Sequence, residues 1–249
     1  MRRGRSHNLS VGRGRRDDSE STSATCFTAS IERAEIRGNG SLGPWELVGK
    51  MGSERWGFAA IVVGANLYII GGNDGKKAVA SVERLTLDPS GNVGRSEPLV
   101  ELKVPRWALG AAHHGDYLYA FGGHDGENTL RTIERARVQD DSSLGDWELV
   151  GPMIDRRQGA TAIVDDDRVY IVGGYAGVGP GGTPGNDYLG AVESALIAKD
   201  GLLGRFEKMS PMRSPRGYHG VVTAGHRLYA IGGGNGDAFV PTVERLNLP

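Results

Sequence analysis

Leu67-Tyr-Ile-Ile-Gly-Gly72 is the strongest indication of the fold, because three similar segments follow it along the chain. The copies read Leu118-Tyr-Ala-Phe-Gly-Gly123, Val169-Tyr-Ile-Val-Gly-Gly174 and Leu228-Tyr-Ala-Ile-Gly-Gly233. From each tyrosine to the next the spacing is 51, 51 and 59 residues. A period of this length indicates a repeat architecture, in which each unit buries its apolar faces only against its neighbours.

Three further columns repeat in step with this one: an arginine before it, a Val-Glu-Arg triplet after it, and an aromatic residue beyond the triplet. The arginines are Arg55, Arg106, Arg157 and Arg216. The residues that we expect to be structural are Tyr68, Tyr119, Tyr170, Tyr229, Gly71, Gly72, Gly122, Gly123, Gly173, Gly174, Gly232, Gly233, Trp45 and Trp147. The columns depart from their pattern at Ser194, which replaces an arginine of the triplet, and at Ser96 and Phe206, which replace tryptophan.

Each repeat reads as four short strands. Gly57–Val63 is apolar throughout, which predicts an inner strand buried on both faces, and Leu67–Ile70 forms the next strand. Ser81–Leu87 alternates, and Trp147–Val150 shows the fourth strand most clearly. No segment has a sustained helical period. Four antiparallel strands in about 50 residues predict one blade of an all-β propeller.

These residues resemble the kelch repeat, and the resemblance covers about residues 27–249. The bacterial variety of the repeat, with Asp-Gly-x-Leu-Gly-x-Trp, is most similar to Gly40-Ser-Leu-Gly-Pro-Trp45 and Ser142-Ser-Leu-Gly-Asp-Trp147. The resemblance implies a β-propeller built from four-stranded blades. It says little about function, because one fold serves many functions.

We expect two parts of the chain. Residues 1–25 form an Arg-rich disordered tail, in which Asn8–Gly14 is at most a decayed second strand. Residues 26–249 form a propeller of about five repeats with the first and last incomplete. The expected blades cover about 26–50 (partial), 51–102, 103–150, 151–209 and 210–249 (partial). The ring is then open or truncated, unless Trp45–Val48 supplies the missing strand to the last blade and closes four blades.

The chain departs from the common spacing once, between Gly174 and Glu193, where eight extra residues enter. Residues 176–187 are rich in glycine and proline, so they predict a mobile surface loop.

Composition excludes several classes of protein. Glycine makes up 40 of 249 residues without a period of three, so it serves turns rather than collagen. One cysteine excludes an internal disulfide framework, and a net charge of −1 gives no reason to expect nucleic-acid binding. There is no apolar run long enough for a membrane span and no secretory signal. The default location is therefore the cytoplasm, with an extracellular one if the chain is a fragment.

Strand parity places the candidate site. In an up-and-down blade, the loops after the glycine pairs share one face with the turns that hold the arginines. Guanidinium groups around an axis would bind carboxylates well, and some kelch propellers that the chain resembles bind acidic peptides in this way. The alternative is that each arginine pairs with the glutamate of its own Val-Glu-Arg triplet. The candidate binding residues are Arg55, Arg106, Arg157, Arg216, Trp56, Trp107, Tyr218, His124 and Tyr175.

These features predict a non-catalytic interaction module that binds a protein or an acidic peptide on this face. The alternatives are a carbohydrate-directed enzyme or binder, similar to the kelch-like epimerases and oxidases, and an inert fragment of a larger surface protein. The sequence shows no catalytic constellation, no metal-ligand set and no cofactor motif.

Overall fold

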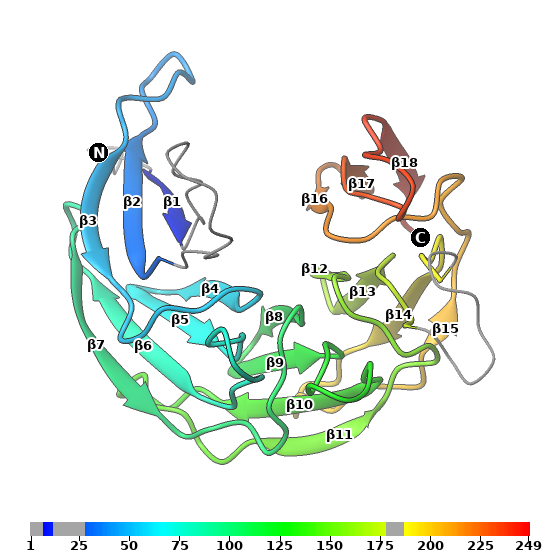
Figure 1. The fold of residues 1–249 in the computed structure, drawn as a ribbon, viewed down its shortest axis with the longest axis horizontal. Helices are drawn as coiled ribbons and strands as arrows, with labels where there is room; N and C mark the ends of the chain where they lie inside the picture. Colours follow the sequence, from blue (N-terminus) through cyan, green and yellow to red (C-terminus); the bar gives the residue numbers. More distant parts are fainter. Residues whose placement is uncertain (1–6, 12–27, 178–186) are drawn as a thin grey trace.

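A computed structural model of the chain describes residues 7–11, 28–177 and 187–249. Five antiparallel sheets follow one another around an open arc, and the first and last sheets lie on either side of the opening (Figure 1). We number them blade 1 to blade 5 in chain order. No helix that could cross a membrane occurs among the described residues.

Every blade is a meander, with its strands adjacent in the order in which they occur along the chain. Blade 1 holds β1 (His7–Val11), β2 (Ser30–Glu35) and β3 (Glu46–Lys50). Blade 2 holds β4 (Ala59–Val63), β5 (Asn66–Ile70), β6 (Val82–Leu87) and β7 (Val93–Leu99). Blade 3 holds β8 (Gly110–His114), β9 (Tyr117–Phe121), β10 (Thr132–Arg137) and β11 (Glu148–Pro152). Blade 4 holds β12 (Thr161–Asp165), β13 (Arg168–Val172), β14 (Val192–Leu196) and β15 (Glu207–Lys208). Blade 5 holds β16 (Gly220–Thr223), β17 (Arg227–Ile231) and β18 (Val243–Asn247).

The expected fold is confirmed: three blades have four strands, and the first and last have three. The alternative in which Trp45–Val48 completes the last blade is wrong, because β3 pairs with β2 and places Gly49 opposite Ile31. The expected tail also needs correction. Residues 7–11 form β1, which pairs with β2 in the position of a second strand. The boundary at residue 25 therefore does not separate a tail from the sheets.

Apolar cores lie between successive blades. The tyrosine column points toward the next blade along the chain: Tyr68 packs with Leu118 and Trp147 of blade 3, and Tyr170 packs with Leu228 of blade 5. The residue two positions after each tyrosine shares this face, and Ile70, for example, is fully buried. Each blade thus has a forward face, which covers the following blade, and a backward face.

The expectation of an inner strand buried on both faces is wrong for blade 2. The exposure of β4 alternates, and Val62 is 50% exposed. Val62 pairs with Leu67, on the backward face toward blade 1. Since no described residue forms a strand inside β1, nothing in the described chain covers this end of β4. Most of the loop expected at 176–187 lies outside the described residues, as does Cys26.

Candidate interaction surface

The loops that end at the arginines and the loops that follow the glycine pairs lie together, as strand parity predicts. The residue after each arginine forms a two-way backbone bridge to the residue after the glycine pair. Trp56 bridges to Asn73, and Trp107 to His124, with N···O distances of 2.9–3.0 Å. Gln158 and Tyr175 form the same bridge in blade 4. We call the side of the molecule formed by these two sets of loops the loop face.

The four arginines are buried beneath the loop face. At most 5% of each side chain is exposed. Their Nη1 atoms donate to the first glycine carbonyl of the same blade, as from Arg106 to Gly122 (2.8 Å). Their Nη2 atoms face the glutamate of the triplet. These pairs are Arg55–Glu83 (3.5 Å), Arg106–Glu134 (2.6 Å), Arg157–Glu193 and Arg216–Glu244 (2.6 Å).

The glutamates accept hydrogen bonds from the backbone as well as from the arginines. Glu134 also accepts hydrogen bonds from the backbone N–H groups of Lys103 and Val104, in the loop that leads to Arg106. Burial lowers the pKa of Arg106, and the Glu134 charge opposes this shift. Each pair thus anchors an entry loop to the third strand of its blade, and buried charges must be paired in this way. This arrangement corrects the hypothesis of arginines that bind an acidic ligand, because their guanidinium groups do not reach the surface.

The glycine pairs join one blade to the next. The N–H of Gly123 donates to the Arg157 carbonyl oxygen (2.9 Å) in the following blade. Gly123 has a φ of +93°, and a Cβ there would lie 2.8 Å from the Trp107 carbonyl oxygen. Gly72 and Gly174 donate in the same way to the next arginine. The conformation and the close approach both require glycine.

Aromatic side chains lie on the loop face, whereas the four arginines are buried beneath it. The rings of Trp56 and Trp107 lie 4.5 Å apart between centroids, and Trp107 lies 5.4 Å from His124. Tyr175 and Tyr188 form a second pair, at 5.0 Å. All five side chains are half-buried. The structure thus brings together the aromatic candidates of neighbouring blades, and packing holds them in place.

A chain of backbone hydrogen bonds links the inner ends of these loops from blade to blade. Ala108 donates to the Gly57 carbonyl (2.6 Å), Gly159 to Ala108 (2.7 Å) and Tyr218 to Gly159 (2.7 Å). All four residues have positive φ, and Tyr218, at +54°, is the only bulky one. A large side chain in this region is strained, and such strain clusters at functional sites.

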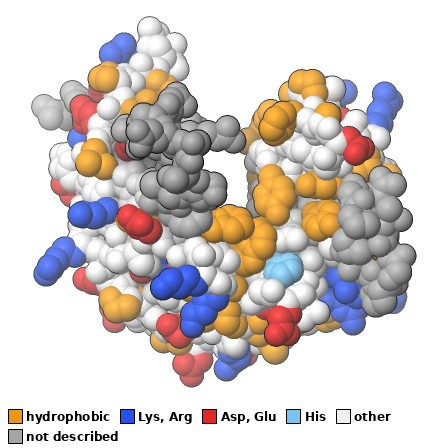
Figure 2. Space-filling view, viewed as in Figure 1, with side chains coloured by type: hydrophobic (Ala, Val, Ile, Leu, Met, Phe, Trp, Pro, Cys, Tyr) orange, Lys and Arg blue, Asp and Glu red, His pale blue; other side chains and the backbone are white. Residues whose placement is uncertain are grey.

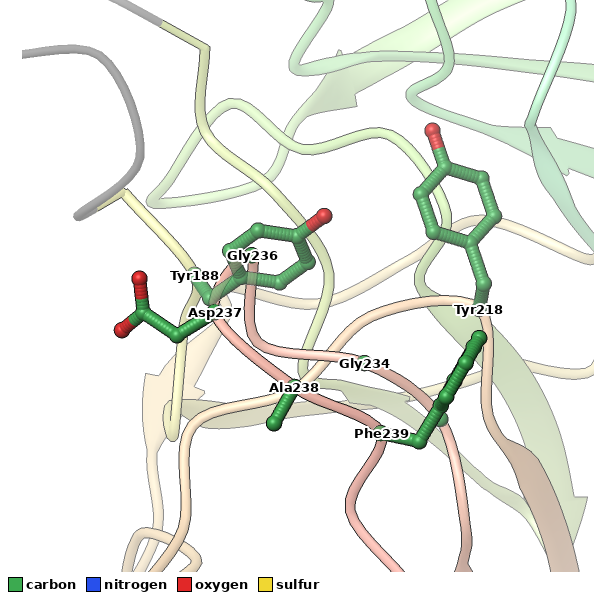
Figure 3. A pocket seen from close by; sticks show the side chains of 8 residues that line it. Tyr188, Tyr218, Gly234, Gly236, Asp237, Ala238 and Phe239 are labelled. Carbon is green, nitrogen blue, oxygen red and sulfur yellow. The ribbon is translucent and has the colours of Figure 1, made fainter.

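The strained Tyr218 borders a pocket of about 730 Å³ on the loop face of blade 5. Tyr188 from blade 4 and Phe239 complete the aromatic part of its wall, and Asp237 also lines it, with a carboxylate that points away from the three rings (Figure 3). Tyr218 is 55% exposed and Phe239 is 92% exposed. The rest of the lining is Gly233, Gly234, Gly236 and Ala238. Small residues therefore form the floor, and aromatic rings form the rim.

Sequence reasoning included Tyr218 but missed Tyr188, Asp237 and Phe239. Tyr188 follows the insertion, where the columns lose their phase. Phe239 occupies the position of Ala78 and Thr129, where each forms a bridge to the residue after the glycine pair. Tyr188 holds the same position in blade 4, so large aromatic residues in blades 4 and 5, where blades 2 and 3 have small ones, were the available signal.

Two groups of titratable residues lie outside this pocket. His219 is 7% exposed, and neither ring nitrogen has a hydrogen-bond partner among the described residues. Burial, and to a lesser extent the Arg216 charge, lowers the pKa of His219 to about 4. On the opposite face, Asp165, Asp166 and His226 place potential ligand atoms within 4.8 Å of one another. Asp166 and His226 are exposed.

Comparisons with known proteins agree with this architecture. The model of the Kelch motif matches residues 108–135 and 215–249. Beta-scruin of Limulus polyphemus is 28% identical over 77% of this chain and 20% of its own length. Human Kelch-like protein 38 is 28% identical over 67% of this chain and 25% of its own length. The chain thus spans a quarter or less of these relatives. The repeats in the sequence, the blades in the structure and these matches agree: the chain is a kelch-repeat protein whose repeats form the blades of an open β-propeller.

Proposed function

We propose that this chain is a non-catalytic protein-interaction module that binds its partner at the aromatic pocket of the loop face. The observation that carries the proposal is the pair of exposed rings, Tyr218 and Phe239, on the rim of one pocket. Aromatic anchors of this kind supply much of the binding energy at protein interfaces. The similarity to Kelch-like and scruin proteins supports a protein-interaction role.

The lining favours a particular class of partner. Aromatic rings over a glycine floor would accept an apolar side chain, and the floor would let the partner's backbone approach closely. Asp237 is the one acidic residue in the lining, and its carboxylate points away from the rings, so a lysine or arginine that flanks the apolar anchor outside the rings would complete the contact. Since the four arginines are buried in ion pairs, the proposed partner presents an apolar segment with a basic group rather than an acidic peptide.

A carbohydrate is the second candidate at the same pocket. The observation in its favour is the combination of three aromatic rings with one carboxylate, since apolar sugar faces pack on rings and hydroxyl groups donate to carboxylates. The two candidates predict different ligands for the same residues, so one variant tests both.

The experiment uses the purified chain as bait for a displayed library of random peptides and, separately, for a glycan array. The test variant is Tyr218→Gly, which removes the ring while suiting the positive φ at this position. The control is Leu149→Ser, an equally exposed apolar residue on β11 (55%), away from the pocket. We expect peptides with an apolar residue next to a basic one to bind the wild type and the control but not Tyr218→Gly. Binding that survives in Tyr218→Gly would overturn the proposal, and glycans in place of peptides would select the second candidate.

A further inference from the structure

In blades 2 and 3, a tyrosine and an arginine at equivalent positions donate hydrogen bonds to the next blade. The Tyr68 hydroxyl donates to the Ser142 carbonyl oxygen (2.8 Å), in the turn between the third and fourth strands of the next blade. Arg84, from the triplet of the same blade, donates to the neighbouring Asp141 carbonyl oxygen (2.8 Å). Tyr119 and Arg135 repeat this geometry one blade later, on Gly201 and Asp200, each at 2.7 Å.

Blade 5 presents the same forward face, and no sheet formed by the described residues covers it. Tyr229 pairs with Arg245, and Ile231 pairs with Val243, so these four side chains lie on one face. Ile231 is 43% exposed and Val243 is 60% exposed. Their counterparts in blade 2, Ile70 and Val82, are at most 1% exposed.

The polar groups of this face are open as well. Among the described residues, neither the Tyr229 hydroxyl nor the Arg245 guanidinium has a hydrogen-bond partner, and Val222 beside them is 49% exposed. Figure 2 shows apolar side chains exposed in the region of β16–β18. We call the surface of Val222, Tyr229, Ile231, Val243 and Arg245 the forward face of blade 5.

Blade 1 exposes the kind of surface that is covered in blades 3 and 4 by the forward face of the preceding blade. Its turn at 37–41 has the same two backbone hydrogen bonds as the turn at 139–143 of blade 3. In both turns the N–H of the first residue donates to the carbonyl oxygen of the fifth, and the N–H of the fourth donates to the carbonyl oxygen of the first. Gly40 has the positive φ of its counterpart Ser142. Asn39 and Gly40 therefore offer the two carbonyl groups that the arginine and tyrosine of a preceding blade bind.

The apolar part of this surface is exposed too. Trp45 is 47% exposed, whereas its counterpart Trp147 is 1% exposed under blade 2. Leu42 is 43% exposed, whereas Leu144 is 5% exposed. We call the surface of Asn39, Gly40, Leu42 and Trp45 the backward face of blade 1. One chain thus carries both halves of a blade-to-blade interface, and both halves are exposed.

We propose that two copies of this chain associate head to tail, with the backward face of blade 1 of one copy on the forward face of blade 5 of the other. Arg245 and Tyr229 then donate to the Asn39 and Gly40 carbonyl groups of the second copy, and Trp45 and Leu42 cover Val243 and Ile231. The contact joins two different surfaces, so a pair with twofold symmetry forms it twice and closes, and an unclosed arrangement grows into chains. A net charge of −1 does not oppose the association.

The test is sedimentation of the purified full chain over a range of concentrations, with Val243→Glu for one surface and Trp45→Glu for the other. Each variant places an unpaired carboxylate in the proposed interface, so we expect each alone to weaken association more than about tenfold. Leu149→Glu, on an exposed site outside both surfaces, is the control and should associate as the wild type does. All of these sites are exposed in the single chain, so circular dichroism should show an unchanged fold.

Mixing the two variants gives the decisive result. Val243→Glu keeps an intact blade 1, and Trp45→Glu keeps an intact blade 5, so an equal mixture should form a dimer with one intact interface at a concentration at which neither variant associates alone. Three results would overturn the proposal. They are a wild-type chain that stays monomeric at every accessible concentration, association that the two variants leave unchanged, and a mixture that does not associate although each variant keeps one of the two proposed surfaces intact.

Discussion

The Arg106 guanidinium lies 2.6 Å from the Glu134 carboxylate, and neither side chain is exposed to solvent. The two residues lie in the arginine column and the triplet column of one repeat, and the same pairing recurs in blades 2, 4 and 5. A charged column that recurs in a sequence can therefore serve the interior of each repeat rather than a shared binding surface.

The first prediction concerns this ion pair. Arg106→Met leaves the Glu134 carboxylate buried without its partner, so we expect the free energy of unfolding to fall by about 3–5 kcal/mol in urea titration. The matched control is Arg137→Met in the same blade, whose pair with Asp116 is exposed (3.1 Å) and is expected to contribute less than about 1 kcal/mol. Equal effects of the two substitutions would show that the buried pair has no special role.

The second prediction concerns the glycine pair. Gly123→Val combines a positive φ with a Cβ 2.8 Å from a carbonyl oxygen, so it should destabilise the chain by several kcal/mol. Gly126→Val is the control, because Gly126 also has a positive φ (+112°) but has no atom within 4 Å of the added Cβ. We expect the control to show only the backbone strain, about 1–3 kcal/mol. Identical melting temperatures for the two variants would mean that the close approach to Trp107 does not matter.

The third prediction concerns pH. The pKa of His219 is about 4 in the folded chain and about 6.5 in the unfolded chain, so the unfolded state binds the proton more tightly between these values. The stability that comes from neutral His219 is complete above about pH 6.5 and is lost as the pH falls toward 4, by roughly 3 kcal/mol in total. Urea titrations across this window should show the slope in the wild type and in His226→Gln, an exposed histidine of the same blade, but not in His219→Leu. A slope that persists in His219→Leu would assign the pH dependence to another group.

The fourth prediction compares two tryptophans of one column. Trp147 is 1% exposed and its Nε1 donates to the Val100 carbonyl (3.1 Å), so Trp147→Ala should lower the free energy of unfolding by about 3–5 kcal/mol. Trp45 is 47% exposed, and we expect Trp45→Ala to lower it by less than half as much. The measurement is urea denaturation at a protein concentration low enough to keep the chain monomeric. If both substitutions cost the same, Trp45 is buried in solution.

The repeat made much of this structure predictable. Period and alternation are local properties of the chain, so they predicted the strands, their order within each blade and the shared face of the loops. The glycine pairs were predictable for the same reason, since a strand that ends in Gly-Gly turns where the next blade approaches. The aromatic pocket was only partly predictable, because Tyr188 follows an insertion that breaks the phase.

The local sequence of each repeat specifies the strands of one blade, whereas the arrangement of the blades specifies which of their faces are covered. The column pattern of Trp45 matches that of Trp147, yet one ring is exposed and the other is buried, because blade 2 lies against Trp147 whereas the described residues form no blade before blade 1. Ile231 and Ile70 differ in the same way, because blade 3 covers Ile70 whereas no sheet of the described residues covers Ile231. The direction of the arginine side chains also depends on tertiary structure. A guanidinium group on a flexible side chain can reach either the loop face or the glutamate of its repeat, and the nearby carboxylate in a water-poor interior stabilises the inward position. Burial depends on neighbours that a repeat cannot specify from within, and this is why the same residues are core in one blade and surface in another.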